Sequence, residues 1–507
     1  MSDIRTVFRD VGAVFIMIGI VSLVTLVVPL YFQEYGSFTP SYNGLIAILV
    51  TAAVFFLCGF PLYYVFRRAD PANFKSAMVT AALGWFLVSL IGSIPFWLMP
   101  YNVQTLATMD ILSGFFESMS GWTGTGLTMV NNEELLPYTL QFWRSFIQWI
   151  GGVGVIVLTL SILARPGTGS YVLYKGEARD QKTHPSVVST VRTIWWIFLL
   201  YTAIGVVLLM IVGFVYPGTE MNAWESLNHA MTGIATGGFS VTDDSITSFG
   251  GISQFIIVIL MVLGSIAFAS HYDLLKGRFK RFLYDPQFKS LMIIIAAGIL
   301  VLTFINVNEV LNFSLISDAF APAAFQFISA LTCTGFQSVP TLSTWSESAK
   351  LLLAFAMVIG GAAGSTAGGI KLFRAILLYK GVGWRIKKAI STPRRVFVHK
   401  LGDKPLSTEN AMDLINEAAI ISFMWIIILS ASVLFLSTLY PNHTLGTVIF
   451  EVCSAQGNVG LSAGITSYEM LDTAKGMLIL NMWVGRLEII PVIVLIRSFF
   501  GVRRNLI

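Results

Sequence analysis

Apolar runs of transmembrane length recur along the whole chain of 507 residues. A helix needs about 20 mostly apolar residues to cross the hydrocarbon core of a bilayer. On that criterion the sequence predicts about ten membrane-spanning helices, at residues 11–31, 43–66, 77–99, 139–163, 192–215, 252–274, 288–306, 349–378, 411–439 and 474–500. Shorter apolar stretches lie between some of these, at residues 108–121, 223–235, 319–332 and 446–456. Each ends in a run rich in Gly, Thr and Ser and is too short to cross, so we expect it to be re-entrant.

The four short stretches share a pattern, because each can be aligned on a single glycine. The aligned glycines are Gly126, Gly237, Gly335 and Gly460, each preceded by a β-branched residue. Nine residues earlier every copy has a polar residue, which is Glu117, Asn228, Gln326 or Glu451. A further glycine follows 25–27 residues later, inside the next span, at Gly151, Gly264, Gly360 and Gly485. Small residues there let neighbouring helices approach closely. Agreement at matching offsets in four copies indicates a fourfold internal repeat.

The sequence therefore predicts an all-α polytopic membrane protein with four helix–pore-loop–helix repeats in a pseudo-fourfold arrangement. We expect residues 1–75 to form two additional N-terminal transmembrane helices outside the repeat. The four expected repeats are residues 76–165, 190–281, 286–380 and 409–507. Residues 381–408 are expected to form a basic cytoplasmic loop.

Composition supports the membrane assignment and excludes several classes of site. The chain is 55% hydrophobic and 12% charged, with a mean hydropathy of +0.76, whereas soluble domains carry roughly 25% charged residues. The cysteines (Cys58, Cys333 and Cys453) are far apart and form no CxxC pair, and the five histidines are scattered. The sequence thus predicts neither a disulfide framework nor a zinc site. It also lacks the clustered His, Asp or Cys of a membrane enzyme, and no organic cofactor is expected.

The distribution of Lys and Arg predicts the orientation. In a ten-span arrangement all basic clusters fall on one side: before the first span, in every second loop, and in the C-terminal tail. The positive-inside rule makes that side cytoplasmic. We therefore expect a multi-pass protein of the cytoplasmic (inner) membrane with both termini in the cytoplasm. The net charge of +5 is then explained by topology, and no nucleic-acid partner is expected.

The repeated loops have the properties of an ion-selectivity filter. A cation that leaves water needs replacement oxygens, and converging backbone carbonyls supply them in potassium channels. Glycine reaches the backbone angles that such a strand requires, and β-branched neighbours stiffen the rest. The predicted filter residues are Gly124, Thr125, Gly126, Ala235, Thr236, Gly237, Cys333, Thr334, Gly335, Asn458, Val459 and Gly460. The polar residues Glu117, Asn228, Gln326 and Glu451 are expected to brace the loops from behind rather than to touch the ion.

A glycine-rich segment interrupts the eighth span. It contains Gly360, Gly361, Gly364, Ser365, Thr366, Gly368 and Gly369. Each glycine costs a helix about 1 kcal/mol relative to alanine, so we expect an unwound intramembrane loop that gates the path. A close helix-packing seam is the alternative. Arg486 stands where the other repeats have a small residue, and a charge at this depth should face the interior. It could hold the glycine-rich segment through its carbonyls or repel cations; alternatively, it could form a structural pair with Glu488 or another acidic residue.

These motifs resemble the Trk/Ktr/HKT superfamily of cation transporters. The resemblance rests on TGTGL at 123–127, ATGGF at 235–239, TCTGF at 332–336 and NVGL at 458–461. WIGGVGVIVL at 149–158 and GGAAGSTAGGIK at 360–371 are also similar to family stretches. The two additional N-terminal spans resemble those of the bacterial and archaeal Trk branch.

That resemblance implies a potassium-uptake subunit with K⁺ as the transported ion and one pore per subunit. It also implies a homodimer that works on a cytosolic ring of RCK-type nucleotide-binding regulatory subunits. In the superfamily a serine in place of the first filter glycine accompanies sodium transport, so Gly126 favours potassium, although Gly124 stands where a threonine is common. Alternatives are a sodium-permeable pore, a sodium- or proton-coupled potassium symporter and, less in keeping with four repeats of equal topology, an inverted-repeat secondary transporter.

Overall fold

The computed structural model describes residues 2–35, 43–102, 106–154, 187–309, 316–391, 399–401 and 404–500. Among these residues, six helical stretches are long and apolar enough to cross a membrane: Ile4–Tyr31, Gly44–Val65, Phe74–Leu98, Val188–Val215, Pro286–Val307 and Thr408–Leu439. They correspond to α1 (Ser2–Ser22) with η1 (Leu23–Leu26) and α2 (Val27–Tyr31), α3 (Gly44–Val65), α4 (Phe74–Gly92) with α5 (Ile94–Leu98), α10 (Val187–Val215), α15 (Pro286–Glu309) and α19 (Thr408–Leu439).

Two further predicted spans are sharply bent. The chain bends by 106° between α12 (Gly251–Ser265) and α13 (Phe268–Leu275). It bends by 111° between α21 (Asp472–Arg486) and α22 (Ile490–Phe500). Each pair counts as one span if it crosses as a broken helix, which gives up to eight.

In each of the remaining two predicted spans, no single described helix covers the full length. α7 (Tyr138–Val153) reaches the limit of the described residues at Gly154, so residues 155–163 of its predicted span lie outside them. α17 (Glu347–Ile359) ends where the glycine-rich segment begins, and α18 (Leu372–Ala389) follows that segment. The all-α multi-span fold is confirmed.

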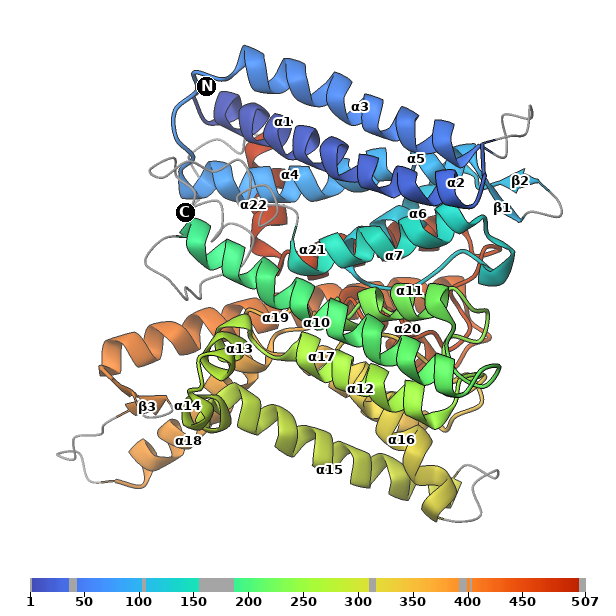
Figure 1. Cartoon of the computed structure of the whole chain (residues 1–507). Coiled ribbons are helices and arrows are strands. Elements are labelled where there is room, and N and C mark those ends of the chain that lie inside the picture. The colour runs from blue at the N-terminus through green and yellow to red at the C-terminus, as the bar shows by residue number, and fades with distance from the viewer. Residues whose placement is uncertain are drawn as a thin grey trace.

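Four short helices occupy the predicted re-entrant stretches. They are α6 (Ile111–Thr123), α11 (Ala223–Ile234), α16 (Ile316–Leu331) and α20 (Leu445–Gln456). Caps fix where three of them begin: the side chains of Asp110, Asn222 and Thr444 accept hydrogen bonds from backbone N–H groups of the first turn. All four lie in the half of the molecule away from the start of α1 (Figure 1). We call these helices the pore helices.

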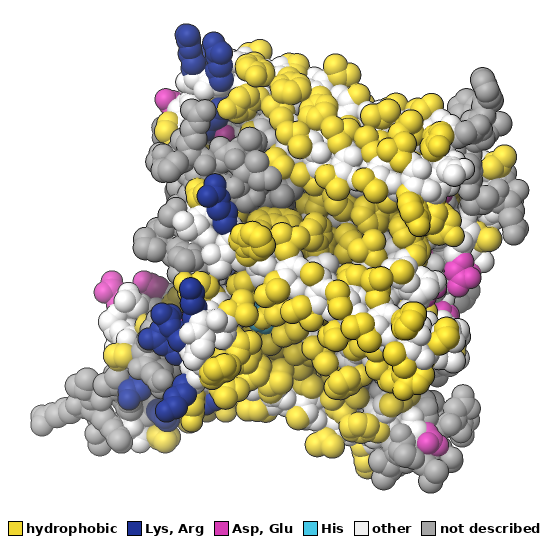
Figure 2. All heavy atoms as spheres, viewed as in Figure 1, with side chains coloured by type: hydrophobic (Ala, Val, Ile, Leu, Met, Phe, Trp, Pro, Cys, Tyr) yellow, Lys and Arg dark blue, Asp and Glu magenta, His cyan; other side chains and the backbone are white. Residues whose placement is uncertain are grey.

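Side-chain chemistry divides the molecule into a middle and two ends. Figure 2 shows apolar side chains over the middle and Lys and Arg gathered at the end where α1 begins. That end includes basic residues of α18, among them Arg385, Lys387 and Lys388. Of the other basic loops predicted from the sequence, residues 155–186 and 392–398 lie outside the described residues.

The few remaining elements are small. α14 (Phe279–Tyr284) and η3 (Glu133–Leu135) lie in connections. Two antiparallel hairpins pair β1 (Pro100–Asn102) with β2 (Ala107–Thr108), and β3 (His399–Leu401) with β4 (Lys404–Leu406).

Candidate functional site

Each pore helix is followed by a loop with the same unusual backbone. We call these glycine loops 1 to 4: residues 124–127, 236–239, 333–336 and 458–461. The first residue of each loop has a positive φ: Gly124 (+68°), Thr236 (+50°), Cys333 (+55°) and Asn458 (+53°). The third residue is always glycine with a larger positive φ: Gly126 (+92°), Gly238 (+77°), Gly335 (+93°) and Gly460 (+98°). Four segments far apart in the sequence thus adopt one conformation.

The four loops meet in a closed ring. A Cβ atom added to the third residue of any loop would lie within 3.0 Å of the carbonyl oxygen of the second residue in the next loop. The pairs are Gly126 with Gly237, Gly238 with Thr334, Gly335 with Val459, and Gly460 with Thr125. Loop 1 thus contacts loop 2, loop 2 contacts loop 3, loop 3 contacts loop 4, and loop 4 contacts loop 1. Because real Cβ atoms essentially never come so near a backbone oxygen, only glycine fits at these four positions.

The alignment predicted from the sequence is wrong by one residue in loop 2. In every loop the second residue donates its N–H to the carbonyl five residues earlier: Thr125 to Ser120 (2.8 Å), Gly237 to Thr232 (2.9 Å), Thr334 to Ser329 (2.9 Å) and Val459 to Ser454 (2.9 Å). Gly237 therefore matches Thr125, and Gly238 takes the ring position that was assigned to Gly237. Ala235 lies one residue before the loop, as the cap of α11.

Two of the predicted bracing residues bind the chain directly after their own loops. The carboxylate of Glu117 accepts from the Thr128 hydroxyl (3.0 Å) and the Met129 N–H (2.8 Å). Glu451 accepts in the same way from Ser462 (2.7 Å) and the Ala463 N–H (2.9 Å). Each carboxylate thus ties the chain just beyond the glycine to its pore helix.

The other two predicted bracing residues behave differently. Asn228 donates to the Trp224 carbonyl of its own helix (2.8 Å), whereas the next residue, His229, contacts the Ser240 hydroxyl at 2.8 Å. His229 holds the position equivalent to Glu117 once the register of loop 2 is corrected. Gln326 is fully buried, and its side-chain amide has no hydrogen-bond partner among the described residues.

Arg144 of α7 joins loops 1 and 2. Its guanidinium donates to Glu117 (2.8 Å), to the Thr128 hydroxyl (3.1 Å) and to the Ser240 carbonyl (2.9 Å), and it lies 4.3 Å from the centre of the Phe239 ring. The side chain is 1% exposed. Arg144 is not among the site residues predicted from the sequence, although a basic residue inside a predicted span, here five residues from its start, is a signal that could have found it.

The ring opens on a cavity of about 210 Å³ on the side of the pore helices' first turns. All four ring glycines line it, together with Glu133, Arg144, Asp243 and Asp244. Burial raises the pKa of Glu133 to about 8, against the opposing effect of Arg144, whose guanidinium lies 3.7 Å away. Acidic side chains that follow loops 1 and 2 thus line one side of this entrance to the ring.

The glycine-rich segment, residues 360–371, lies on the other side of the ring and is not helical. Gly360, Gly364, Gly369 and Lys371 all have positive φ. Thr366 bonds through its N–H (3.1 Å) and its hydroxyl (2.9 Å) to the carbonyl of Gly264, and it accepts a bond from the Thr236 hydroxyl of loop 2 (3.0 Å). Gly369 donates to the carbonyl of Gly457, just before loop 4 (3.0 Å).

Arg486 links this segment to the first repeat. Its guanidinium donates to the Thr366 carbonyl (3.0 Å) and to the carbonyls of Gly151 and Gly152 in α7, the latter at 3.0 Å. Glu488, the alternative partner, is paired with Arg374 instead. Arg486 thus binds backbone carbonyls of the first and third repeats. This is the arrangement expected if it holds the glycine-rich segment through its carbonyls.

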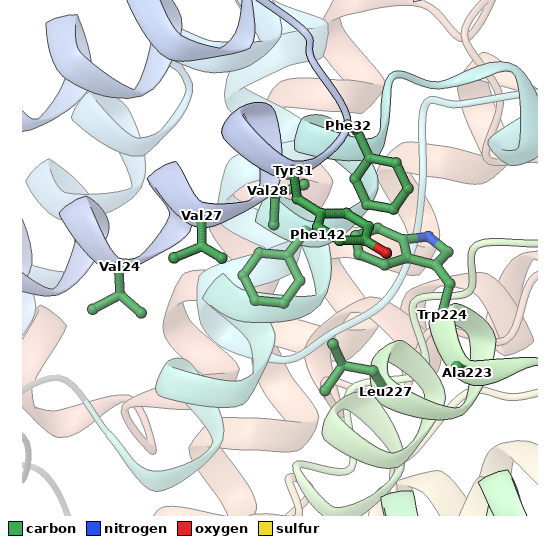
Figure 3. Close-up of a pocket in the computed structure, with 9 residues that line it drawn as sticks. All are labelled: Val24, Val27, Val28, Tyr31, Phe32, Phe142, Ala223, Trp224 and Leu227. Carbon is green, nitrogen blue, oxygen red and sulfur yellow. The ribbon is translucent and has the colours of Figure 1, made fainter.

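A second cavity, of about 510 Å³, lies outside the loops (Figure 3). Apolar and aromatic side chains from η1, α2, α7 and α11 line it, including Val24, Phe142 and Leu227. It offers no cluster of oxygens to a cation. No group of three or more His, Cys, Asp or Glu in the described part of the chain could hold a metal ion.

The chain is similar to known proteins over nearly its whole length. The family model TrkH, described as a cation transport protein, matches residues 44–500. An uncharacterized cation transporter of Methanocaldococcus jannaschii is 34% identical over 500 residues, covering 98% of this chain and 96% of that protein. The Trk system potassium uptake protein TrkH of Escherichia coli K12 is 29% identical, covering 98% and 99%. The crystal structure of the potassium transporter TrkH from Vibrio parahaemolyticus superposes with a TM-score of 0.80 at 25% identity, covering 98% and 99%.

Proposed function

The chain belongs to the TrkH family of cation transport proteins, and on that premise we propose that it carries potassium into the cell through one pore enclosed by its four glycine loops. The observation that carries the proposal is the closed ring, in which the glycine of each loop faces a carbonyl oxygen of the next. The relatives described as potassium uptake proteins agree with this ion.

An ion that enters such a pore must lose most of its hydration water. A bare cation at low dielectric is prohibitively unstable, so oxygens must replace water along the whole narrow path. Main-chain carbonyls from four loops can do this without any charged side chain. The pore helices direct their C-terminal ends, which carry partial negative charge, toward the loops and favour a cation there. In this proposal the selecting groups belong to residues 124–126, 236–238, 333–335 and 458–460.

The glycine-rich segment and Arg486 are the proposed gate. The segment lies next to loops 2 and 4. It is hydrogen-bonded to the carbonyls of Gly264 and Gly457 and to the guanidinium of Arg486. A guanidinium beside the path also repels cations. Release of the Arg486 contacts would free a segment whose glycines give it little conformational preference of its own.

We further propose that a cytosolic RCK-type nucleotide-binding regulator acts on this gate in a homodimer. α18 begins directly after the glycine-rich segment and carries Arg385, Lys387 and Lys388 toward the basic end. By the positive-inside rule that end is cytoplasmic, which would also put the N-terminus, with Arg5 and Arg9, in the cytoplasm. Movement of α18 by a bound regulator would act directly on the segment.

Ion flux from purified protein in liposomes tests the ion assignment. We expect K⁺ and Rb⁺ to pass and Na⁺ to pass at least about tenfold more slowly, which is a difference of about 1.4 kcal/mol. A preference for Na⁺ would overturn the potassium assignment. Dependence of K⁺ flux on a Na⁺ or H⁺ gradient would replace the pore by a coupled symporter.

A further inference from the structure

Glycine loop 2 differs from the other loops at its second residue. That position is Thr125, Thr334 or Val459 in loops 1, 3 and 4, but Gly237 in loop 2. β-Branched side chains restrict the backbone that carries them, whereas glycine is the most flexible residue. The carbonyl of Gly237 nevertheless belongs to the ring, beside Gly126. Loop 2 therefore needs another source of rigidity.

The side chain of Gln148, on α7, fills the space left by the missing side chain. A Cβ atom added to Gly237 would lie 2.6 Å from Cδ of Gln148, and the three nearest atoms all belong to the Gln148 amide. That amide bonds to the loop on both sides of Gly238. Nε2 donates to the Gly237 carbonyl (2.7 Å), and Oε1 accepts from the Phe239 N–H (3.0 Å). Gln148 is fully buried.

This amide is specific to the first repeat. Gln148 stands 22 residues after the ring glycine Gly126, and the residues at the same distance in the other repeats are Leu260, Met357 and Met482. All three are buried and apolar. A polar side chain is therefore not needed for the packing of a repeat at this register. It occurs only beside the loop that lacks a side chain of its own.

We propose that Gln148 is a positioning residue for ion selection, whose amide replaces the absent side chain of Gly237 and fixes the ring carbonyl of loop 2. This inference rests on the proposed function of the ring as the selecting element. The donated hydrogen bond holds the Gly237 oxygen in one orientation, and the accepted bond from Phe239 prevents the peptide beyond it from rotating. Without the clamp, two adjacent glycines leave this quarter of the ring free to adopt other conformations.

The pairing of Gln148 with Gly237 can be tested by exchange. The backbone of Gly237 is outside the positive-φ region, so a side chain is sterically possible there once the Gln148 amide is removed. The variants are Gln148→Leu, Gln148→Ala, Gly237→Thr and the double variant Gln148→Ala with Gly237→Thr. The ratio of Rb⁺ to Na⁺ flux is measured in liposomes for each, with Leu260→Ala as the control for lost core volume at the same register.

We expect each single variant at Gln148 or Gly237 to lower the Rb⁺ to Na⁺ ratio by about tenfold, corresponding to about 1.4 kcal/mol of lost discrimination. The double variant regains most of that ratio, because it recreates the arrangement of loops 1, 3 and 4. Leu260→Ala keeps the ratio of the wild type. If a single variant does not fold, the double variant should still fold and select.

Either of two flux results would overturn the inference: an unchanged ratio in Gln148→Leu, or a double variant no more selective than Gln148→Ala. A double variant that fails to fold would count against it equally, since its loop should be the ordinary one. These failures are distinct from a failure of the proposed function, in which the wild type itself would not discriminate between Rb⁺ and Na⁺.

Discussion

Space at the ring decides which residues the glycine loops can contain. Gly335 has a φ of +93°, and a Cβ there would meet the carbonyl oxygen of Val459. Both facts exclude a side chain, since the backbone angle is strained for any other residue and the space is taken by an oxygen of the proposed path. Gly126 and Gly460 are constrained in the same way.

We therefore expect Gly335→Ala to reduce Rb⁺ uptake into liposomes by at least about tenfold, because a strained backbone of this kind alone costs on the order of 1–3 kcal/mol. Gly476→Ala is the matched control. Gly476 lies in α21, and beyond the neighbouring backbone of its own helix no atom lies within 4 Å of the place where its Cβ would be. Normal uptake by Gly335→Ala would mean that the ring does not enclose the path.

Glu133 places a titratable group in the cavity of about 210 Å³ beside the ring. Its pKa is raised to about 8 by burial, so the carboxyl is mostly neutral at pH 7 and becomes charged as the pH rises through 8. Arg144, Glu117 and Asp243 are the charged groups that act on it. A carboxylate gained beside a cation path stabilises an entering ion by about 1 kcal/mol when water screens it.

The apparent affinity for external Rb⁺ should accordingly increase a few-fold between pH 7 and pH 9, the size of effect that about 1 kcal/mol produces. Glu133→Gln should remove that increase and remain near the low-pH value. Uptake at several Rb⁺ concentrations and pH values measures both. An equal increase in Glu133→Gln would assign the pH dependence to another group.

At the scale of elements, hydrophobic length predicted most of the helices. The four pore helices begin and end within three residues of the predicted stretches, because each is a short apolar run that ends near a glycine, and three of them begin at a polar cap. The sequence alone could not predict which glycine of loop 2 corresponds to Gly126. In Ala235-Thr236-Gly237-Gly238 either glycine can be aligned with Gly126, and the two are distinguished by the positive φ of Gly238 and the backbone hydrogen bond of Gly237.

The same ambiguity concealed His229, because Asn228 and His229 are both polar neighbours on one helix. Gln148 and Arg144 were missed for a different reason. The partners of Gln148, and the Ser240 carbonyl that Arg144 also binds, belong to the second repeat, and an internal alignment compares positions within repeats but does not reveal contacts between them. The glycine-rich segment, in contrast, is non-helical as predicted from its composition.

Substitution of Arg486 tests the proposed gate, because this side chain connects the glycine-rich segment to α7. Arg486→Ala should raise basal Rb⁺ flux in the absence of any regulator by about tenfold, as expected if about 1.4 kcal/mol of closed-state stability is lost. Arg497→Ala, an exposed arginine of α22, is the control. Unchanged or lower flux at normal expression would contradict the proposed gate.

For the molecule as a whole, charge and hydrophobicity together set the proposed orientation. Basic side chains gather at the end where α1 begins (Figure 2), whereas the cavity lined by Glu133, Asp243 and Asp244 lies on the side of the ring away from the glycine-rich segment. This arrangement attracts cations to one entrance and follows the positive-inside rule at the other.

Thiol labelling can test that orientation, because Cys333 and Cys453 are buried and Cys58 can be replaced. In a Cys58→Ser background, Glu134→Cys should react with a membrane-impermeant maleimide in intact cells, and Lys387→Cys only after permeabilisation. Both positions are exposed. The reverse pattern would invert the proposed topology.

The most direct measurement is the anomalous scattering of Rb⁺ or Tl⁺ in crystals of this protein. We predict ion peaks on the axis of the ring, surrounded by carbonyl oxygens from all four glycine loops, among them those of Thr125, Gly237, Thr334 and Val459. Peaks found only outside the ring, or loops separated by packed protein with no ion between them, would contradict it.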